Sequence, residues 1–363
     1  MNEAIFVALL LLVFLVILHC PCGKRRTNRK FKKKNARTTC RNRKQNDHEA
    51  KPKPIPFTAS MLADIAGFLD RSFNANGLVG MCQAAFDFDI EIRELIAKGP
   101  DSNDAKLQQF IAEQTAIVIT LGVAFAEATA AAAQSAPEIK FAAIDVVYPA
   151  TTPNLQGIVF ASQEGAFLAG YLAAGMSTTG KVGTYGGEQI PPVVAFMTGY
   201  AGGVTYYNQQ HGTNVQTLGL DLFVGDFVSL PIGRQFTLDL IAQGADIIFP
   251  VAGPIGLATA QVCFETGQAL FIGVDSDWFE TALDFHSIVL SSVLKRINVA
   301  AYNAIAAVRA NQFQGGEVLY NLANNGVDLA PYHDFEPVVP PALKAEIVVV
   351  KQGIINGTII VPG

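Results

Sequence analysis

The stretch GADIIFPVAGPIG, at residues 244–256, decides the fold class of this chain. It is an apolar run of strand type that ends directly in a loop of Gly and Pro, and it follows a helix-type stretch, QFTLDLIAQG, at residues 235–244. The same alternation of strand-type and helix-type segments recurs from about residue 56 onward. This alternation is typical of an α/β fold, in which helices cover both faces of parallel sheets.

Five further short apolar runs predict strands: TAIVITLG, KFAAIDVVY, GKVGTYGG, ALFIGVDS and HSIVLSSVL. Helices are predicted between them in stretches such as DAKLQQFIAEQ and AFLAGYLAAGM. This number of strands implies two sheets, one in each of two lobes. The turn-rich segment PATTPN, at residues 149–154, predicts the crossing from the first lobe to the second.

Several of these strands end in loops rich in Gly or Asp, namely TYGGEQ, VAGPIG and GVDSD. In open parallel sheets, ligands bind outside the carboxyl ends of the strands. We therefore expect these loops to line one cleft between the two lobes, which predicts a binding site.

The chain has 363 residues, half of them apolar, which is enough for two packed lobes. Of its 26 Lys and Arg residues, 14 lie within residues 24–53, whereas the chain from residue 54 onward carries 12 basic and 28 acidic residues. The folded part is therefore acidic, with a formal charge near −16. An acidic body argues against a nucleic-acid-binding surface.

The five cysteines include no CxxC pair and no His at metal-ligand spacing, so they predict neither a metal site nor a disulfide framework. Cys82 and Cys263 lie in apolar helix-type runs, which is typical of small buried thiols.

An unbroken apolar run of 14 residues at residues 5–18 has the length of a signal-peptide core and is short for a membrane span. Cys20 follows directly and predicts lipidation, which would tether the protein to the outer face of the cell membrane. However, the basic residues follow the run, and positive charge there resists translocation. Three interpretations stay open: an atypical lipoprotein signal, an uncleaved anchor, or a wrongly assigned start of the chain.

The predicted division of the chain has five parts. A signal or anchor segment at 1–22 precedes a basic disordered tether at 23–54, which has too few apolar residues to fold. The first lobe is expected at 55–150, and 151–270 should form mainly the second lobe. Residues 271–363 should supply the hinge crossings and the remaining elements of both lobes.

Between about residues 64 and 307 the chain resembles the basic membrane protein family of substrate-binding lipoproteins, also described as purine nucleoside receptors. The resemblance is carried in order by DIAGFLDRSFN, FAAIDVVY, NLQGIVFASQEGAFLAGYLAAGMSTTGKVGTYGG, PPVVAFMTGYAGGV, GADIIFPVAGPIG, IGVDSD and SSVLKRINVAAYNAI. It implies a two-lobed periplasmic-binding fold of type I, in which each lobe is a parallel sheet flanked by helices. It also implies an extracytoplasmic protein of an ABC importer, with permease subunits as partners and no cofactor.

The resemblance further implies that the lobes close on a purine nucleoside, with the base between aromatic rings and the ribose held by carboxylates and a lysine. In the first lobe, Asp64 ends the first strand and could accept hydrogen bonds from purine nitrogens, or cap the following helix. Phe73 could stack on the base, or pack in the core. Asn74 follows it in the same loop or first helical turn.

Asp145 and Asp275 each close a strand at its carboxyl end, so they could reach the ribose hydroxyls from opposite lobes. Lys295 would balance these acids and donate to the ligand, or else lie on the surface at a helix start. Gly253 would let the backbone approach the ligand closely. Phe196 is the candidate for the aromatic ring opposite Phe73.

Two features depart from the family pattern. Leu69 stands before Asp70 where the family has two adjacent acids. The first strand also looks weak, because three prolines precede residue 58.

We predict that the protein is not an enzyme, with no catalytic residues. A nucleoside-processing enzyme would need a cluster of Asp residues in one loop or a phosphate-binding set, and a lone Gly pair in TYGGEQ is neither. A ligand-responsive regulator is the second alternative, because the same core occurs fused to DNA-binding heads. Residues 24–53 show no helix-turn-helix pattern, so no nucleic-acid partner is expected.

Overall fold

The computed structural model of the protein describes residues 57–363. The predicted signal segment, the basic tether and the lipidation site Cys20 lie outside the described residues. Within residues 57–363, no helix is both long enough and apolar enough to cross a membrane.

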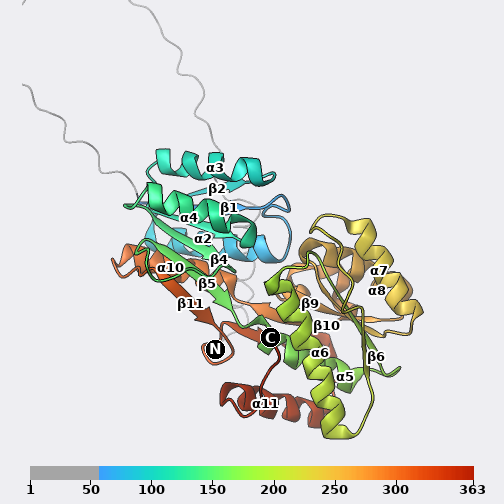
Figure 1. The fold of residues 1–363 in the computed structure, drawn as a ribbon. Coiled ribbons are helices and arrows are strands. Elements are labelled where there is room, and N and C mark those ends of the chain that lie inside the picture. The colour runs from blue at the N-terminus through green and yellow to red at the C-terminus, as the bar shows by residue number, and fades with distance from the viewer. Residues whose placement is uncertain (1–56) are drawn as a thin grey trace, which may run out of the picture. The chain divides into compact units, whose positions relative to one another are not determined.

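The first sheet has six parallel strands in the order β11-β5-β4-β3-β1-β2. Their bounds are β1 (Thr58–Ala63), β2 (Glu91–Ile96), β3 (Ile117–Leu121), β4 (Lys140–Ile144), β5 (Leu155–Phe160) and β11 (Gly316–Tyr320). Successive residues of β1 point to opposite faces: Met61 packs with helices α2 (Phe73–Phe88) and α10 (Ile297–Arg309), and Leu62 with α3 (Pro100–Ala112) and α4 (Ala126–Ser135). The sheet is therefore buried on both faces (Figure 1).

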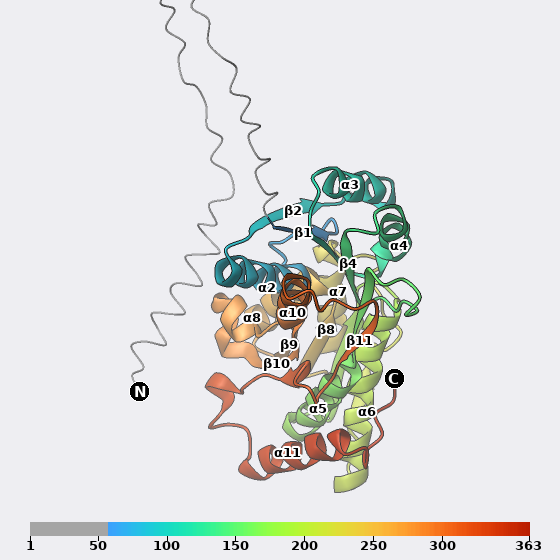
Figure 2. The same ribbon diagram turned by 90° about the vertical axis from the view of Figure 1, so that its left-hand side faces the viewer.

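The second sheet has the order β12-β10-β9-β8-β6-β7, in which only β12 is antiparallel to its neighbour. Its strands are β6 (Lys181–Gly186), β7 (Gln216–Leu218), β8 (Ile247–Val251), β9 (Leu270–Asp275), β10 (Val289–Lys295) and β12 (Val327–Leu329). Helices α5 (Ser162–Met176) and α6 (Pro191–His211) cover one face, and α7 (Leu230–Ala242) and α8 (Gly256–Thr266) cover the other. Helix α11 (Pro341–Ile355) packs outside α5 (Figure 2).

These two helix-covered sheets are the two lobes of a type I periplasmic-binding fold, as predicted. All six apolar runs predicted as strands form strands, in β3, β4, β6, β8, β9 and β10. The expectation of a weak first strand is wrong, because all six residues of β1 are buried between β2 and β3. The three prolines precede this strand and remove none of its ladder hydrogen bonds.

The predicted crossing at residues 149–154 is also wrong. This segment links β4 to β5, which pair in parallel in the same sheet, so the first lobe continues to Phe160. The turn is fixed to its own lobe by Asn154, whose amide donates to the carbonyls of Ala133, Ala136 and Ile139. Turn residues signal a change of direction, and here the chain turns back into the same sheet.

The chain crosses between the sheets three times: between β5 and α5, between β10 and α10, and between β11 and β12. Two of these crossings lie against each other, because the Ala161 amide donates to the Tyr320 carbonyl at 2.8 Å and the Phe160 and Tyr320 rings stack at 5.2 Å. These two crossings therefore pack together.

Candidate ligand-binding cleft

A cavity of about 280 Å³ lies between the lobes and is lined by the loops that follow the carboxyl ends of strands in both sheets. The structure brings all eight predicted site residues to this one cavity: Asp64, Phe73, Asn74, Asp145, Phe196, Gly253, Asp275 and Lys295. Their roles in binding a ligand stay predictions. Their common location follows from the sheet topology, because parallel strands bring their carboxyl ends to the same edge.

Asp145 and Asp275 take equivalent places in the two lobes, directly after β4 and at the end of β9. Both have left-handed backbone conformations, with φ of 65° and 68°. This conformation is uncommon for residues other than Gly and costs about 1–3 kcal/mol, and such strain gathers at functional sites. Gly253 shares it, with φ of 53°. A Cβ added there would meet only Phe227, at 3.9 Å, so the backbone conformation is the visible reason for glycine.

Lys295 is buried at the centre of the cleft, which excludes the alternative of a surface lysine. Its Nζ lies 2.6 Å from Asp145 Oδ2, so the ion pair joins β10 of the second lobe to the first lobe. The ammonium also lies 4.9 Å, 5.1 Å and 5.6 Å from the ring centroids of Phe73, Phe160 and Phe196. Aromatic faces stabilise a desolvated cation. Phe73 and Phe196 also line the cavity, although Phe73 packs partly against the core of its lobe and Phe196 is only 3% exposed.

Asp275 is buried beside this pair and accepts a hydrogen bond of 2.9 Å from the Ser72 hydroxyl of the first lobe. Burial raises the pKa of its carboxyl, the charge of Asp145 raises it further, and Lys295 and Ser72 oppose these effects. Lys295 is thus paired directly with Asp145, and its charge also acts on Asp275. Carboxylates only accept hydrogen bonds, so this end of the cleft is suited to a ligand that supplies hydroxyl donors.

Asp64 does not cap the following helix. Its Oδ1 accepts the Ala66 amide at 3.0 Å and the Asn74 Nδ2 at 2.8 Å. Because a carboxylate cannot donate, this bond fixes which end of the Asn74 amide faces Asp64. Asn74 Oδ1 is buried and has no hydrogen-bond partner in the described part of the chain.

The cap of α2 is Asp70, which accepts hydrogen bonds from the amides of Ser72, Asn74 and Ala75 at 3.2, 2.8 and 2.8 Å. These bonds fix the first turn of α2, where Phe73 and Asn74 lie. Burial raises the pKa of Asp70 to about 6, against the lowering effect of the three amides. Leu69 stands where the family pattern has an acid. It is 88% exposed and does not line the cavity, so this difference from the pattern removes no contact in the cleft.

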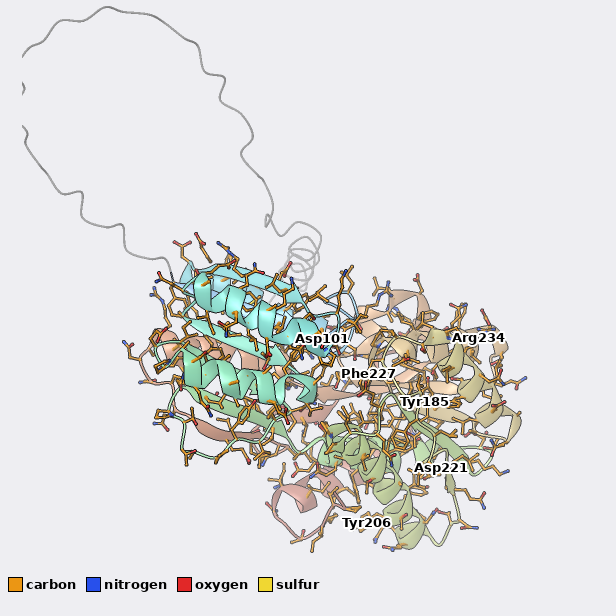
Figure 3. The ribbon with its side chains drawn as sticks, turned by 45° about the horizontal axis from the view of Figure 1, so that its top comes forward. Asp101, Tyr185, Tyr206, Asp221, Phe227 and Arg234 are labelled. Carbon is orange, nitrogen blue, oxygen red and sulfur yellow. The ribbon has the colours of Figure 1, made fainter. Side chains whose placement is uncertain are left out.

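The cavity residues that the sequence did not predict include Lys98, Glu188, Asp226 and Phe227. Glu188 is in the loop TYGGEQ, where the Gly pair was the only recognisable signal. Asp226 and Phe227 lie in the irregular segment between β7 and α7, where no periodicity predicts which side chain turns inward. Figure 3 shows Phe227 where the lobes meet, across from Asp101 at the start of α3.

Six acidic side chains line the cavity against two lysines: Asp64, Asp70, Asp145, Glu188, Asp226 and Asp275, with Lys98 and Lys295. The cleft therefore carries an excess of negative charge. A field of this sign attracts hydrogen-bond donors and cations and repels phosphate groups.

A family model described as "ABC transporter substrate-binding protein PnrA-like" matches residues 57–363. Basic membrane protein A1 of Borrelia garinii is 32% identical over 301 residues, covering 81% of this chain and 85% of that protein. An uncharacterized lipoprotein of Pyrococcus furiosus is 29% identical and covers 74% of this chain and 68% of its own.

Solved structures show the same fold. A solute-binding protein of an ABC transporter system from Aeropyrum pernix superposes with a TM-score of 0.78 at 25% identity, covering 85% of this chain and 94% of that chain. A second solute-binding protein, from Conexibacter woesei, has a TM-score of 0.68 at 21% identity and covers 84% and 98%.

Proposed function

The chain belongs to the family of PnrA-like ABC transporter substrate-binding proteins, and we propose that its solute is a purine nucleoside, bound between the lobes for delivery to an ABC importer. One observation carries the proposal: a buried strand-end carboxylate from each lobe lies beside aromatic rings, Asp145 paired with Lys295 and Asp275 hydrogen-bonded to Ser72. A ribose supplies hydroxyl donors for the carboxylates, and a purine supplies a flat face for the rings.

The size and charge of the cleft support a nucleoside over a nucleotide. A cavity of about 280 Å³ is at the lower end of the usual range for ligand pockets, about 300–1,000 Å³, so it suits a small solute. The excess of acids disfavours a phosphate group.

Titration calorimetry with adenosine, guanosine, inosine and adenosine 5′-monophosphate tests this function. We expect heat from the nucleosides and at least tenfold weaker binding of the monophosphate. Absence of binding by every nucleoside, together with another compound released from the heat-denatured protein, would overturn the proposal. We also expect each nucleoside to be recovered unchanged after incubation, because the protein is proposed to bind its solute without catalysis.

The proposed place of action is the outer face of the cell membrane, with lipid on Cys20. Relatives of this chain are named lipoproteins, which supports the proposal. One acyl chain holds a protein only marginally, whereas several anchor it stably.

We therefore expect Cys20→Ser to be released from membranes or left unprocessed, while Cys40→Ser, in the basic segment that follows, behaves as the wild type. Membrane fractionation and the mass of the N-terminal peptide measure both effects. If Cys20→Ser and Cys22→Ser both stay membrane-bound with an unchanged N-terminus, an uncleaved anchor holds the protein instead.

A further inference from the structure

Glu188 is a half-buried carboxylate in the cavity with no hydrogen bond or ion pair to its side chain within the described chain. It lies in the loop between β6 and α6, directly after Gly187, whose amide and carbonyl are both hydrogen-bonded. The Gly187 amide donates to the Val251 carbonyl at 2.9 Å, and the Gly225 amide donates to the Gly187 carbonyl at 2.9 Å. A free acceptor is therefore presented by a fixed loop.

The ring of Phe227 packs closely against the loop that carries Glu188. A Cβ on Gly187 would lie 2.4 Å from the Phe227 ring, so only glycine admits the ring at this place. Phe227 also lines the cavity, and it comes from the same segment as Asp226. An aromatic wall thus lies next to the free carboxylate.

Two of the charged groups near Glu188 are also carboxylates. Asp64 of the first lobe and Asp226 of the second line the same cavity, and their charges, after burial itself, raise the pKa of Glu188. Asp226 is already engaged by the amides of Val228 and Ser229, and Asp64 Oδ1 by Asn74 and Ala66. Glu188 has the largest unused acceptor capacity.

A second observation points to a ligand at this end. Asn74, which is 1% exposed and donates to Asp64, leaves its Oδ1 buried without a partner. A buried acceptor without a donor is unfavourable, because it has lost its hydrogen bonds to water. No Lys, Arg or His pairs with Asp64, Glu188 or Asp226 among residues 57–363, and no group of three or more potential metal ligands gathers there. A solute with N–H or O–H donors would satisfy these acceptors.

We propose that Glu188 sets the base preference of the cleft by accepting two N–H hydrogen bonds from a purine with donors at N1 and at a 2-amino group. This inference rests on the proposed nucleoside function. Guanosine carries both donors, inosine carries only the N1 donor, and adenosine places an acceptor at N1 against the carboxylate. A site built to accept hydrogen bonds rejects analogues that lack the donors.

The test measures the dissociation constants of guanosine, inosine, 1-methylguanosine and adenosine by calorimetry. For the wild type we expect guanosine to bind about tenfold to a hundredfold more tightly than the other three, which is the range for one hydrogen bond to a charged group. This comparison needs no variant. Equal affinities for the four nucleosides would overturn the role of Glu188 and leave the nucleoside function standing, whereas absence of binding by all four would contradict both.

The variant Glu188→Gln gives a sharper result. Its amide keeps one acceptor for the two donors at N1 and at the 2-amino group of guanine, and its NH2 group can donate to N1 of adenine. We expect the ratio of guanosine to adenosine affinity to fall at least tenfold, with adenosine binding improved. Asp221→Asn is the matched control, because it also removes one acidic charge. Asp221 is exposed in the segment between β7 and α7 and lies away from Phe227 (Figure 3), so this change should leave the ratio unchanged. A uniform loss of affinity for all nucleosides in Glu188→Gln would refute the proposal.

Discussion

At the scale of single residues, the cleft contains two aspartates with strained backbones. Asp145 and Asp275 hold left-handed backbones at the ends of buried strands, where the sheet fixes the preceding residues. The strain is maintained because ladder hydrogen bonds and burial outweigh a cost of about 1–3 kcal/mol per residue. Both carboxylates are consequently set in place before a ligand arrives, which reduces the entropy lost on binding.

Asp70 gives a prediction about pH. Its pKa is raised from an ordinary 3.8 to about 6 in the folded protein, so the folded state binds this proton more readily than the unfolded state between these two values. The contribution of Asp70 to stability must therefore rise as the pH falls through 6 toward 4, and be lost as the pH rises.

Relative to Asp70→Asn, which keeps one oxygen acceptor for the helix amides, we expect the wild type to gain about 2–3 kcal/mol in free energy of unfolding between pH 7 and pH 4. Urea unfolding of both proteins across this range measures the difference. A difference that is constant with pH, or that shrinks as the pH falls, contradicts the raised pKa.

At the scale of elements, the packing of α2 against α10 positions the cleft. Helix α2 begins with Phe73 and Asn74, and α10 starts directly after Lys295 and Arg296. The two helices approach closely at Gly80, where an added Cβ would lie 2.0 Å from the Asn298 carbonyl oxygen. At Gly77 in the same helix, the nearest atoms are the side-chain tips of Leu121, at 3.0 and 3.2 Å.

We expect Gly80→Ala to lower the free energy of unfolding by about 1–3 kcal/mol, because the obstacle is backbone that cannot move alone. Gly77→Ala is the control, since both changes gain the same helix propensity and only Leu121 must yield in the second. Thermal or chemical denaturation measures both. Equal effects of the two substitutions would show that the α2–α10 contact has more freedom than the structure indicates.

How much the sequence predicts also differs by element. Strands with buried apolar runs, and the aspartates directly after them, were predicted because local periodicity and parallel topology fix their places. Glu188 and Asp226 were not, because their positions depend on the irregular segment that pairs Phe223 with Gly186 across 37 residues of chain. The crossing after Phe160 was also missed, since a turn does not reveal whether the next strand joins the same sheet.

At the scale of the whole described body, the lobes are joined by three crossings and meet around one cavity. Contacts across the cleft include the hydrogen bonds from Ser72 to Asp275 and from Lys295 to Asp145. This arrangement suits a hinge, in which the lobes rotate around a solute that neither surrounds alone.

We therefore expect the protein to become more compact when it binds its solute. Small-angle scattering with and without saturating nucleoside measures the radius of gyration, which should fall on binding. Superimposable scattering profiles at saturation would remove hinge closure from the mechanism.

The central claim is that the paired carboxylates hold the sugar of a nucleoside. Its most direct test is a calorimetric titration of the wild type and Asp275→Ala with inosine and with hypoxanthine, the same base without ribose. Because the variant loses a hydrogen-bond partner in a closed site, we expect it to bind inosine more weakly by about ten- to a hundredfold, with a much smaller change for hypoxanthine. Equal losses for inosine and hypoxanthine, or no inosine binding by the wild type, would contradict it.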